Sequence, residues 1–110
     1  MSRIVTIGSA QLGPIAKDEG RQAVVQRLLA LLRKGAEQGC DLIVFPELAL
    51  TTFFPRWYMT DPAEVDSWFE TEMPNAATQP LFDEAKKLGV GFYLGYAEKV
   101  EEGGATHHFN

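Results

Sequence analysis

The feature that most constrains the fold is the apolar run Leu42–Phe45, which stands inside the stretch DLIVFPELAL. Its residues are apolar without alternation, so a strand formed here is expected to have both of its faces covered. Strands of this kind lie inside α/β sheets, where helices pack on the faces. We therefore expect Asp41–Phe45 to be an inner strand of a parallel α/β sheet.

A strand and a long helix are predicted before this run. Arg3–Gln11 is typical of a strand that contains small residues, which allow another element to approach closely. Apolar residues at helical spacing predict a helix from about Glu19 to Gln38, with Asp18 as its capping residue and Gly39 just after its end. Strand, helix and strand form a βαβ unit, which we expect to be parallel and right-handed.

The second half of the chain predicts shorter elements. An aromatic loop covers Thr51–Tyr58, and a short helix follows with Asp61 as its N-cap. Further along we expect a helix over Gln79–Leu88, a strand over Gly91–Val100, and a hairpin partner in Ala105–Asn110. Because this last strand would leave an open edge, we expect residues 1–110 to be the N-terminal segment of a larger α/β domain. A complete small domain with a frayed end is the alternative.

Composition limits the classes of partner. The chain has 110 residues, of which 45% are hydrophobic, and this is enough to bury the core of one domain. With a formal net charge of -5 and scattered Lys and Arg, it is a poor candidate for nucleic-acid binding. No apolar run reaches the roughly 20 residues of a membrane helix, and the first residues lack a signal-peptide layout. We therefore expect a cytoplasmic protein without nucleic-acid or membrane partners.

Glu47 is the candidate catalytic residue. Ligands of open α/β sheets bind beyond the carboxyl ends of the strands, and Glu47 follows such an end. Pro46 stiffens the turn, and the flanking Leu48 and Leu50 predict a partly desolvated acid. Desolvation raises the pKa of a carboxyl group, which suits a general acid or base near neutrality. A structural role, as a cap of the next turn or a partner of an arginine, stays open.

Three side chains shortly after this acid are candidates for a substrate pocket. Phe53, Phe54 and Arg56 follow closely enough to wall it, and the guanidinium offers a bidentate partner for a substrate carboxylate. For the two phenylalanines, core packing or a subunit contact is the alternative. For the arginine, the alternative is a structural salt bridge.

The cysteine and the histidines do not predict a second site. Cys40 and Glu47 bracket the same predicted strand, so at ~3.3 Å per residue they stand over about 20 Å apart. A base must come within about 3 Å of its proton, so we expect Cys40 to be a small apolar residue rather than the nucleophile. His107 and His108 are adjacent on a predicted strand and point to opposite faces, so we expect no metal site.

Several features stand in a diagnostic order. They are a first strand ending in Ser9-Ala10-Gln11, the long helix, LIVFPELAL, the run LGVGFYLGY, and a hairpin reaching Phe109-Asn110. This series resembles the nitrilase superfamily of carbon–nitrogen hydrolases, and the resemblance covers essentially the whole chain. Within that superfamily, ELALTTFFPRW and DPAEVDSWFETEMP are most similar to the N-carbamoyl-D-amino acid amidohydrolases.

The resemblance implies a fold, a reaction and a partner. The fold is an αββα sandwich, of which these residues are the N-terminal part. The reaction is hydrolysis of the carbamoyl C–N bond of a small N-carbamoyl-D-amino acid through a cysteine thioester, without a cofactor. Glu47 matches the glutamate of the Glu-Lys-Cys triad, whereas no lysine of this chain matches the triad lysine and Cys40 does not match the cysteine. The resemblance also implies a homo-oligomer, a dimer or a tetramer, and an isolated fragment without activity.

Two other classes of protein are alternatives. A flavodoxin-like binding or receiver domain needs an acidic cluster or a phosphate loop after its first strand, and the stretch GSAQLGP offers neither. A catalytically inactive relative that keeps the fold is the second alternative. A lysine and then a cysteine after further strands would favour the enzyme over both.

Overall fold

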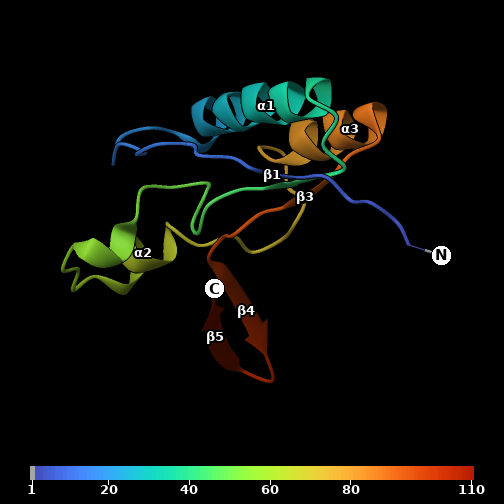
Figure 1. Cartoon of the computed structure of the whole chain (residues 1–110). Coiled ribbons are helices and arrows are strands. Elements are labelled where there is room, and N and C mark those ends of the chain that lie inside the picture. Colours follow the sequence, from blue (N-terminus) through green and yellow to red (C-terminus); the bar gives the residue numbers. More distant parts are fainter. Residues whose placement is uncertain (1) are drawn as a thin grey trace.

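A parallel three-stranded sheet with two helices on one face forms the larger part of this computed structural model, which describes residues 2–110 (Figure 1). Its strands β1 (Ile7–Ser9), β2 (Leu42–Val44) and β3 (Gly91–Tyr93) lie side by side in that order. Both strand pairs are parallel. β2 pairs with both of the other strands and is therefore the central strand, as its unbroken apolar run predicts. Ile43 of β2 is almost completely buried.

The helix between β1 and β2 supplies most of the core. Helix α1 (Arg21–Glu37) packs with α3 (Gln79–Leu88) over the same face of the sheet (Figure 1). The close approach of α1 to β2 depends on Gly35, because a Cβ at this position would lie 2.8 Å from Cδ1 of Ile43. The apolar stripe expected on this helix is confirmed, since its buried residues are Val24, Val25, Leu28, Leu29 and Leu32.

The start of α1 differs from the prediction. Its N-cap is Gly20, which has an extended backbone and no side-chain cap, and not Asp18. The carboxylate of Glu19 instead accepts hydrogen bonds from Arg27 at 2.9 Å and from the backbone N–H of Ala16 at 3.3 Å. The hydrogen bond from Arg27 also lowers the pKa of Glu19. At the other end the prediction is confirmed, because Gly39 follows the helix with a φ of +82°.

The short elements after β2 follow their local sequence signals. The aromatic loop contains one 3-10 turn over Phe54–Arg56, and α2 (Pro62–Asp66) follows it. Asp61 is the N-cap of α2, as predicted, and its side chain accepts a hydrogen bond from the backbone N–H of Ala63 at 3.0 Å. Helix α3 has the predicted bounds and ends at Gly89 in the left-handed conformation.

The predicted strand Gly91–Val100 is two strands in the structure. β3 ends at Tyr93, and β4 (Glu98–Glu102) pairs with β5 (Ala105–Phe109) as an antiparallel hairpin, which Figure 1 shows projecting away from the helical layer. The residues between β3 and β4 leave the ladder because their backbone groups bond elsewhere. Gly95 accepts from the N–H of Ala49 at 2.8 Å, and Ala97 accepts from the N–H of Glu70 at 2.7 Å.

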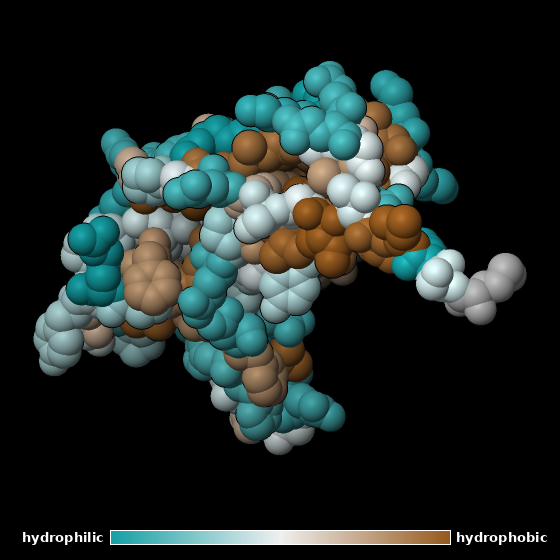
Figure 2. All heavy atoms as spheres, viewed as in Figure 1, coloured by the Kyte–Doolittle hydropathy of each residue, from teal (hydrophilic) through white to brown (hydrophobic). Residues whose placement is uncertain are grey.

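The predicted α/β class with a parallel sheet is confirmed, and the complete αββα sandwich stays a prediction. Ile4 and Ile7 are 90% and 59% exposed near β1. Figure 2 shows apolar atoms gathered below the helical layer toward the N-terminus. Within residues 2–110, every helix falls short of the length and apolar character that a membrane crossing requires.

Candidate functional site

The turn after β2 carries Glu47 and is braced by the chain that follows β3. The N–H of Phe45 donates to the carbonyl of Tyr93 at 2.9 Å, and the N–H of Ala49 donates to the carbonyl of Gly95 at 2.8 Å. Gly95 packs directly on the turn, because a Cβ there would lie 3.0 Å from Cα of Glu47. The backbone of Glu47 is therefore fixed by bonds on both sides of it.

This turn also contains an unusual backbone conformation. Leu48 has a φ of +48°, which is a left-handed conformation that side chains other than glycine seldom adopt. Such strain persists only where the surroundings hold it, and it is concentrated at functional sites. Here the burial of Leu48, which is only 6% exposed, offsets the strain. The conformation sends the leucine inward while the acid beside it stays at the surface.

The desolvation expected for Glu47 is not present in the described residues. Its side chain is exposed, whereas Leu48, Ala49 and Leu50 are buried behind it. The flanking apolar residues therefore pack into the core and do not cover the carboxylate. The prediction assumed that neighbours in sequence surround the acid, and the reversed backbone at Leu48 separates them from it.

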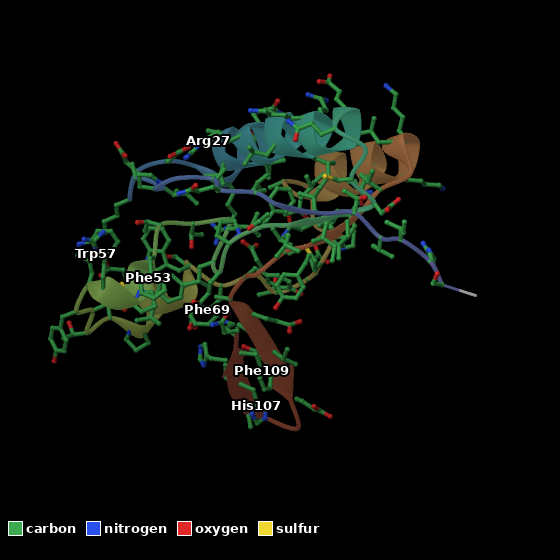
Figure 3. The ribbon with its side chains drawn as sticks, viewed as in Figure 1. Arg27, Phe53, Trp57, Phe69, His107 and Phe109 are labelled. Carbon is green, nitrogen blue, oxygen red and sulfur yellow. The ribbon has the colours of Figure 1, made fainter. Side chains whose placement is uncertain are left out.

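Glu47 lines three open hollows, and Asn110 also lines two of them. One of these two has a volume of about 490 Å³ and is lined by the β3–β4 connection and the end of the hairpin. The other has a volume of about 260 Å³ and is mostly apolar. Its lining includes Phe53 and Phe54 from the aromatic loop, Phe69 after α2, and Phe109 of β5. Figure 3 shows Phe69 between α2 and the hairpin that carries Phe109.

The predicted pocket residues separate into two groups. Phe53 lines the apolar hollow and is 49% exposed, whereas Phe54 is buried and stacks on Trp68 with 6.1 Å between ring centroids. Phe54 thus also has the packing role that was its alternative. Arg56 lies outside both hollows. Its Cζ lies over the ring of Trp57, 5.2 Å from the ring centroid, and within residues 2–110 the side chain forms no salt bridge.

Sequence reasoning did not identify Asn110, which makes the one hydrogen bond that the structure assigns to the Glu47 carboxylate within residues 2–110. Its Nδ2 donates to Oε1 of Glu47 at 2.7 Å. Gly95 and Tyr96 were also missed, and both of them line the larger hollow. Burial raises the pKa of the Tyr96 phenol, and the nearby charge of Glu98 raises it further, so the phenol stays protonated at neutral pH. Local sequence carries no signal for these contacts.

The hairpin is held to α2 by a cluster around Asp66. His108 Nε2 lies 2.9 Å from Asp66 Oδ1, and Lys99 Nζ lies 3.2 Å from Oδ2. These hydrogen bonds, first from His108 and then from Lys99, lower the pKa of Asp66. The ring of Phe69 meets His108 edge-on, with 4.7 Å between centroids. Both histidines are exposed residues of β5, and His108 in addition has a specific partner in Asp66.

Cys40 lies at the opposite end of β2 from Glu47. It is partly buried against the core, and its thiol lies between Gly8 and Gly35, as expected for a small apolar residue. It lines a separate hollow that Glu47 does not touch. Within residues 2–110, no group of three His, Cys, Asp or Glu side chains is arranged to hold a metal ion.

Glu47 stands on a braced turn at the carboxyl end of the central parallel strand, where the ligands of open α/β sheets bind. A comparison with protein families identifies the family of the chain. Residues 6–110 match the family described as carbon-nitrogen hydrolase. The chain therefore belongs to the carbon–nitrogen hydrolases, the nitrilase superfamily.

Proposed function

We propose that this chain supplies the general base, Glu47, of an enzyme that hydrolyses N-carbamoyl-D-amino acids. The observation that carries the proposal is the placement of this carboxylate. It stands on a doubly braced turn at the carboxyl end of β2, where it lines three open hollows. The membership of the carbon–nitrogen hydrolase family supports the reaction class. The similarity of ELALTTFFPRW to the N-carbamoyl-D-amino acid amidohydrolases supports the substrate class.

The chemistry assigns Glu47 two proton transfers. It first takes the proton of a cysteine thiol, and the thiolate attacks the ureido carbonyl carbon. Ammonia leaves with that proton and a thioester remains on the enzyme. Glu47 then takes a proton from water, which attacks the thioester and releases an N-carboxy amino acid, and Glu47 returns this proton to the leaving cysteine sulfur. Loss of carbon dioxide from this product gives the free D-amino acid. A lysine and a backbone N–H would stabilise the oxyanion of each step.

The nucleophile and the lysine of this scheme are proposed to lie outside the described residues. Cys40 is excluded by its position at the other end of β2. The family resemblance implies no cofactor, and a cytoplasmic dimer or tetramer stays a prediction. We expect the isolated 110-residue chain to release no ammonia from an N-carbamoyl-D-amino acid. Turnover by this chain alone would contradict the assignment.

The decisive test is Glu47→Gln in the complete protein. We expect kcat for an N-carbamoyl-D-amino acid, measured as ammonia release, to fall by at least about 100-fold, because positioned bases contribute roughly 10²–10⁴-fold. Glu102→Gln is the control, since this acid is exposed near the hairpin turn and should leave kcat unchanged. Activity of the Glu47 variant within about tenfold of the wild type would remove the base from the mechanism.

A substrate panel tests the finer part of the proposal. N-carbamoyl-D-amino acids, their L counterparts, and simple amides without a ureido group are compared by kcat/KM. We expect the first set to be preferred. Preference for a simple amide would leave Glu47 as the base and would assign the protein to another branch of the family. No turnover of any substrate by the complete protein would favour a catalytically inactive relative.

A further inference from the structure

The contact between Asn110 and Glu47 joins two distant parts of the chain. Asn110 follows the end of β5, and its Nδ2 donates to Oε1 of Glu47 at 2.7 Å. Both residues line both hollows, so the amide stands beside the carboxylate at the place where a substrate would enter. Neither residue is buried, so folding alone does not require this bond. We therefore look for a role of this hydrogen bond in the function of Glu47.

We propose that Asn110 is a positioning residue, which orients the carboxylate of Glu47 for proton transfer, and that the Asp66–His108 contact holds Asn110 in place. The inference rests on the proposed function of Glu47. In this proposal Asn110 contacts the base, Glu47, and does not contact the reacting atoms of the substrate. It also gives the hairpin a role in catalysis.

The chemistry of an amide suits this task. A neutral N–H donor stabilises the ionised carboxylate without neutralising its charge. Binding one oxygen restricts rotation of the carboxylate and leaves the other oxygen to accept a proton. A base that is misplaced by about 1 Å can lose on the order of 100-fold in rate. An exposed glutamate on a strained turn needs such a restraint, because no apolar wall fixes its side chain.

The hairpin holds the side-chain amide of Asn110 in place. His108 and Asn110 are two residues apart near the end of β5, so extended geometry places them on the same side of the chain. His108 is fixed by Asp66 and by the edge of Phe69. The neighbouring strand β4 is fixed as well, because the N–H of Lys99 donates to the carbonyl of Glu70 at 2.9 Å. The fold therefore connects α2 to Glu47 through His108 and Asn110.

Asn110→Ala in the complete protein tests the first part. We expect kcat for an N-carbamoyl-D-amino acid to fall about 10-fold or more, with KM and the thermal midpoint nearly unchanged. Thr106→Ala is the matched control, because this exposed residue of β5 faces Glu101 across the ladder and lies away from the site. Wild-type kcat in Asn110→Ala would overturn the proposal. A loss of kcat that follows a loss of folded protein would do the same.

Asn110→Asp separates positioning from packing. The substituted acid has the same shape but places a second carboxylate beside the first, and two adjacent carboxylates resist joint ionisation. We expect the acid limb of the kcat/KM profile to move to higher pH. The other titratable side chains around Glu47 are Tyr93, Tyr96, Glu98 and His108, which are identical in both proteins. An unchanged acid limb of the kcat/KM profile would contradict a contact between the side chain at position 110 and the Glu47 carboxylate.

His108→Ala tests the second part, and a double variant tests the coupling. We expect the single variant to lower kcat less than Asn110→Ala does, and to add little in the Asn110→Ala background, since both act through one contact. Additive losses would show that His108 acts independently. If Glu47→Gln is itself active, the proposed function fails; if Glu47→Gln is inactive and Asn110→Ala is normal, only the positioning role fails.

Discussion

The helical layer and the hairpin are stabilised by different forces. In the layer, apolar residues of α1, α3 and β2 form one buried cluster, in which Leu28 and Leu81 are completely buried. In the hairpin, every residue of β5 is exposed. Its contacts with α2 are an ion pair and a histidine–aspartate bond, and Phe69, which follows α2, adds an aromatic edge. Burial fixes the layer, whereas specific polar contacts fix the hairpin.

This difference assigns separate tasks to the two regions. The proposed base, Glu47, stands on the turn that leaves the buried sheet, so backbone hydrogen bonds and the buried residues that follow it set its backbone. Its hydrogen-bond partner stands on the hairpin, so polar contacts set the orientation of its side chain. A change in the layer is therefore expected to alter stability, and a change in the hairpin is expected to alter activity or its pH dependence.

The largest effect is expected from the core of the layer. Leu81→Ala removes a completely buried side chain and leaves a cavity, which costs about 2–5 kcal/mol in the free energy of unfolding. Phe109→Ala in the hairpin removes a ring that is 54% exposed, and we expect a loss below about 1 kcal/mol. Denaturant unfolding of both variants measures the difference. Equal losses would contradict the division between the two regions.

The next effect is expected where the two regions meet. Gly95→Ala brings a methyl group to 3.0 Å from both Cα of Glu47 and the carbonyl oxygen of Pro46, and backbone atoms cannot yield easily. We expect a loss of about 1–3 kcal/mol in stability and a clear fall in kcat. Gly20→Ala is the control, since a Cβ there meets nothing within 4 Å. A variant with normal kcat would show that the turn tolerates displacement.

A smaller effect is expected from the link between α1 and the residues before the hairpin. Glu70 is 6% exposed and pairs with Arg21, and its second oxygen accepts from Asn75 at 3.0 Å. Glu70→Gln removes the charge, and we expect a loss of about 1 kcal/mol, since Arg21 is 30% exposed and partly solvated. Glu84→Gln breaks the more exposed pair with Arg33 and should cost less. The reverse order of unfolding free energies would refute this assignment.

The smallest effect is a pH dependence of hairpin docking. The pKa of Asp66 is lowered in the folded protein, first by the hydrogen bond from His108, so its contribution is complete above the unfolded pKa of about 4. That contribution is lost as the pH falls through the lowered folded value. We expect faster amide exchange in β4 and β5 at such pH. Asp66→Asn should remove the pH dependence, and its persistence would place the cause elsewhere.

Local signals predicted the elements that local contacts determine. The apolar stripe of α1, the cap at Asp61, and the helix ends at Gly39 and Gly89 all follow from nearby residues. The central position of β2 follows from its unbroken apolar run. These features could be predicted because each depends on composition and spacing within a few turns of chain.

The remaining features depend on contacts between distant residues. The break between β3 and β4 arises because Gly95 and Ala97 bond to segments far away in sequence. The exposure of Glu47 arises from the conformation of Leu48, which the apolar flanks did not reveal. The candidate base itself was predicted from its place after a buried strand. Its partner Asn110 was not, because no short-range pattern connects the two.

The contact of Gly95 with the turn has a consequence for directed evolution of this protein. The missing Cβ, and not any side chain, allows the two backbones to approach, so no other residue type can substitute by repacking. A saturation library at position 95, sorted for activity, should return almost only glycine. Position 110 should instead admit a few hydrogen-bond donors, and the two enrichment profiles would distinguish a steric requirement from a chemical one.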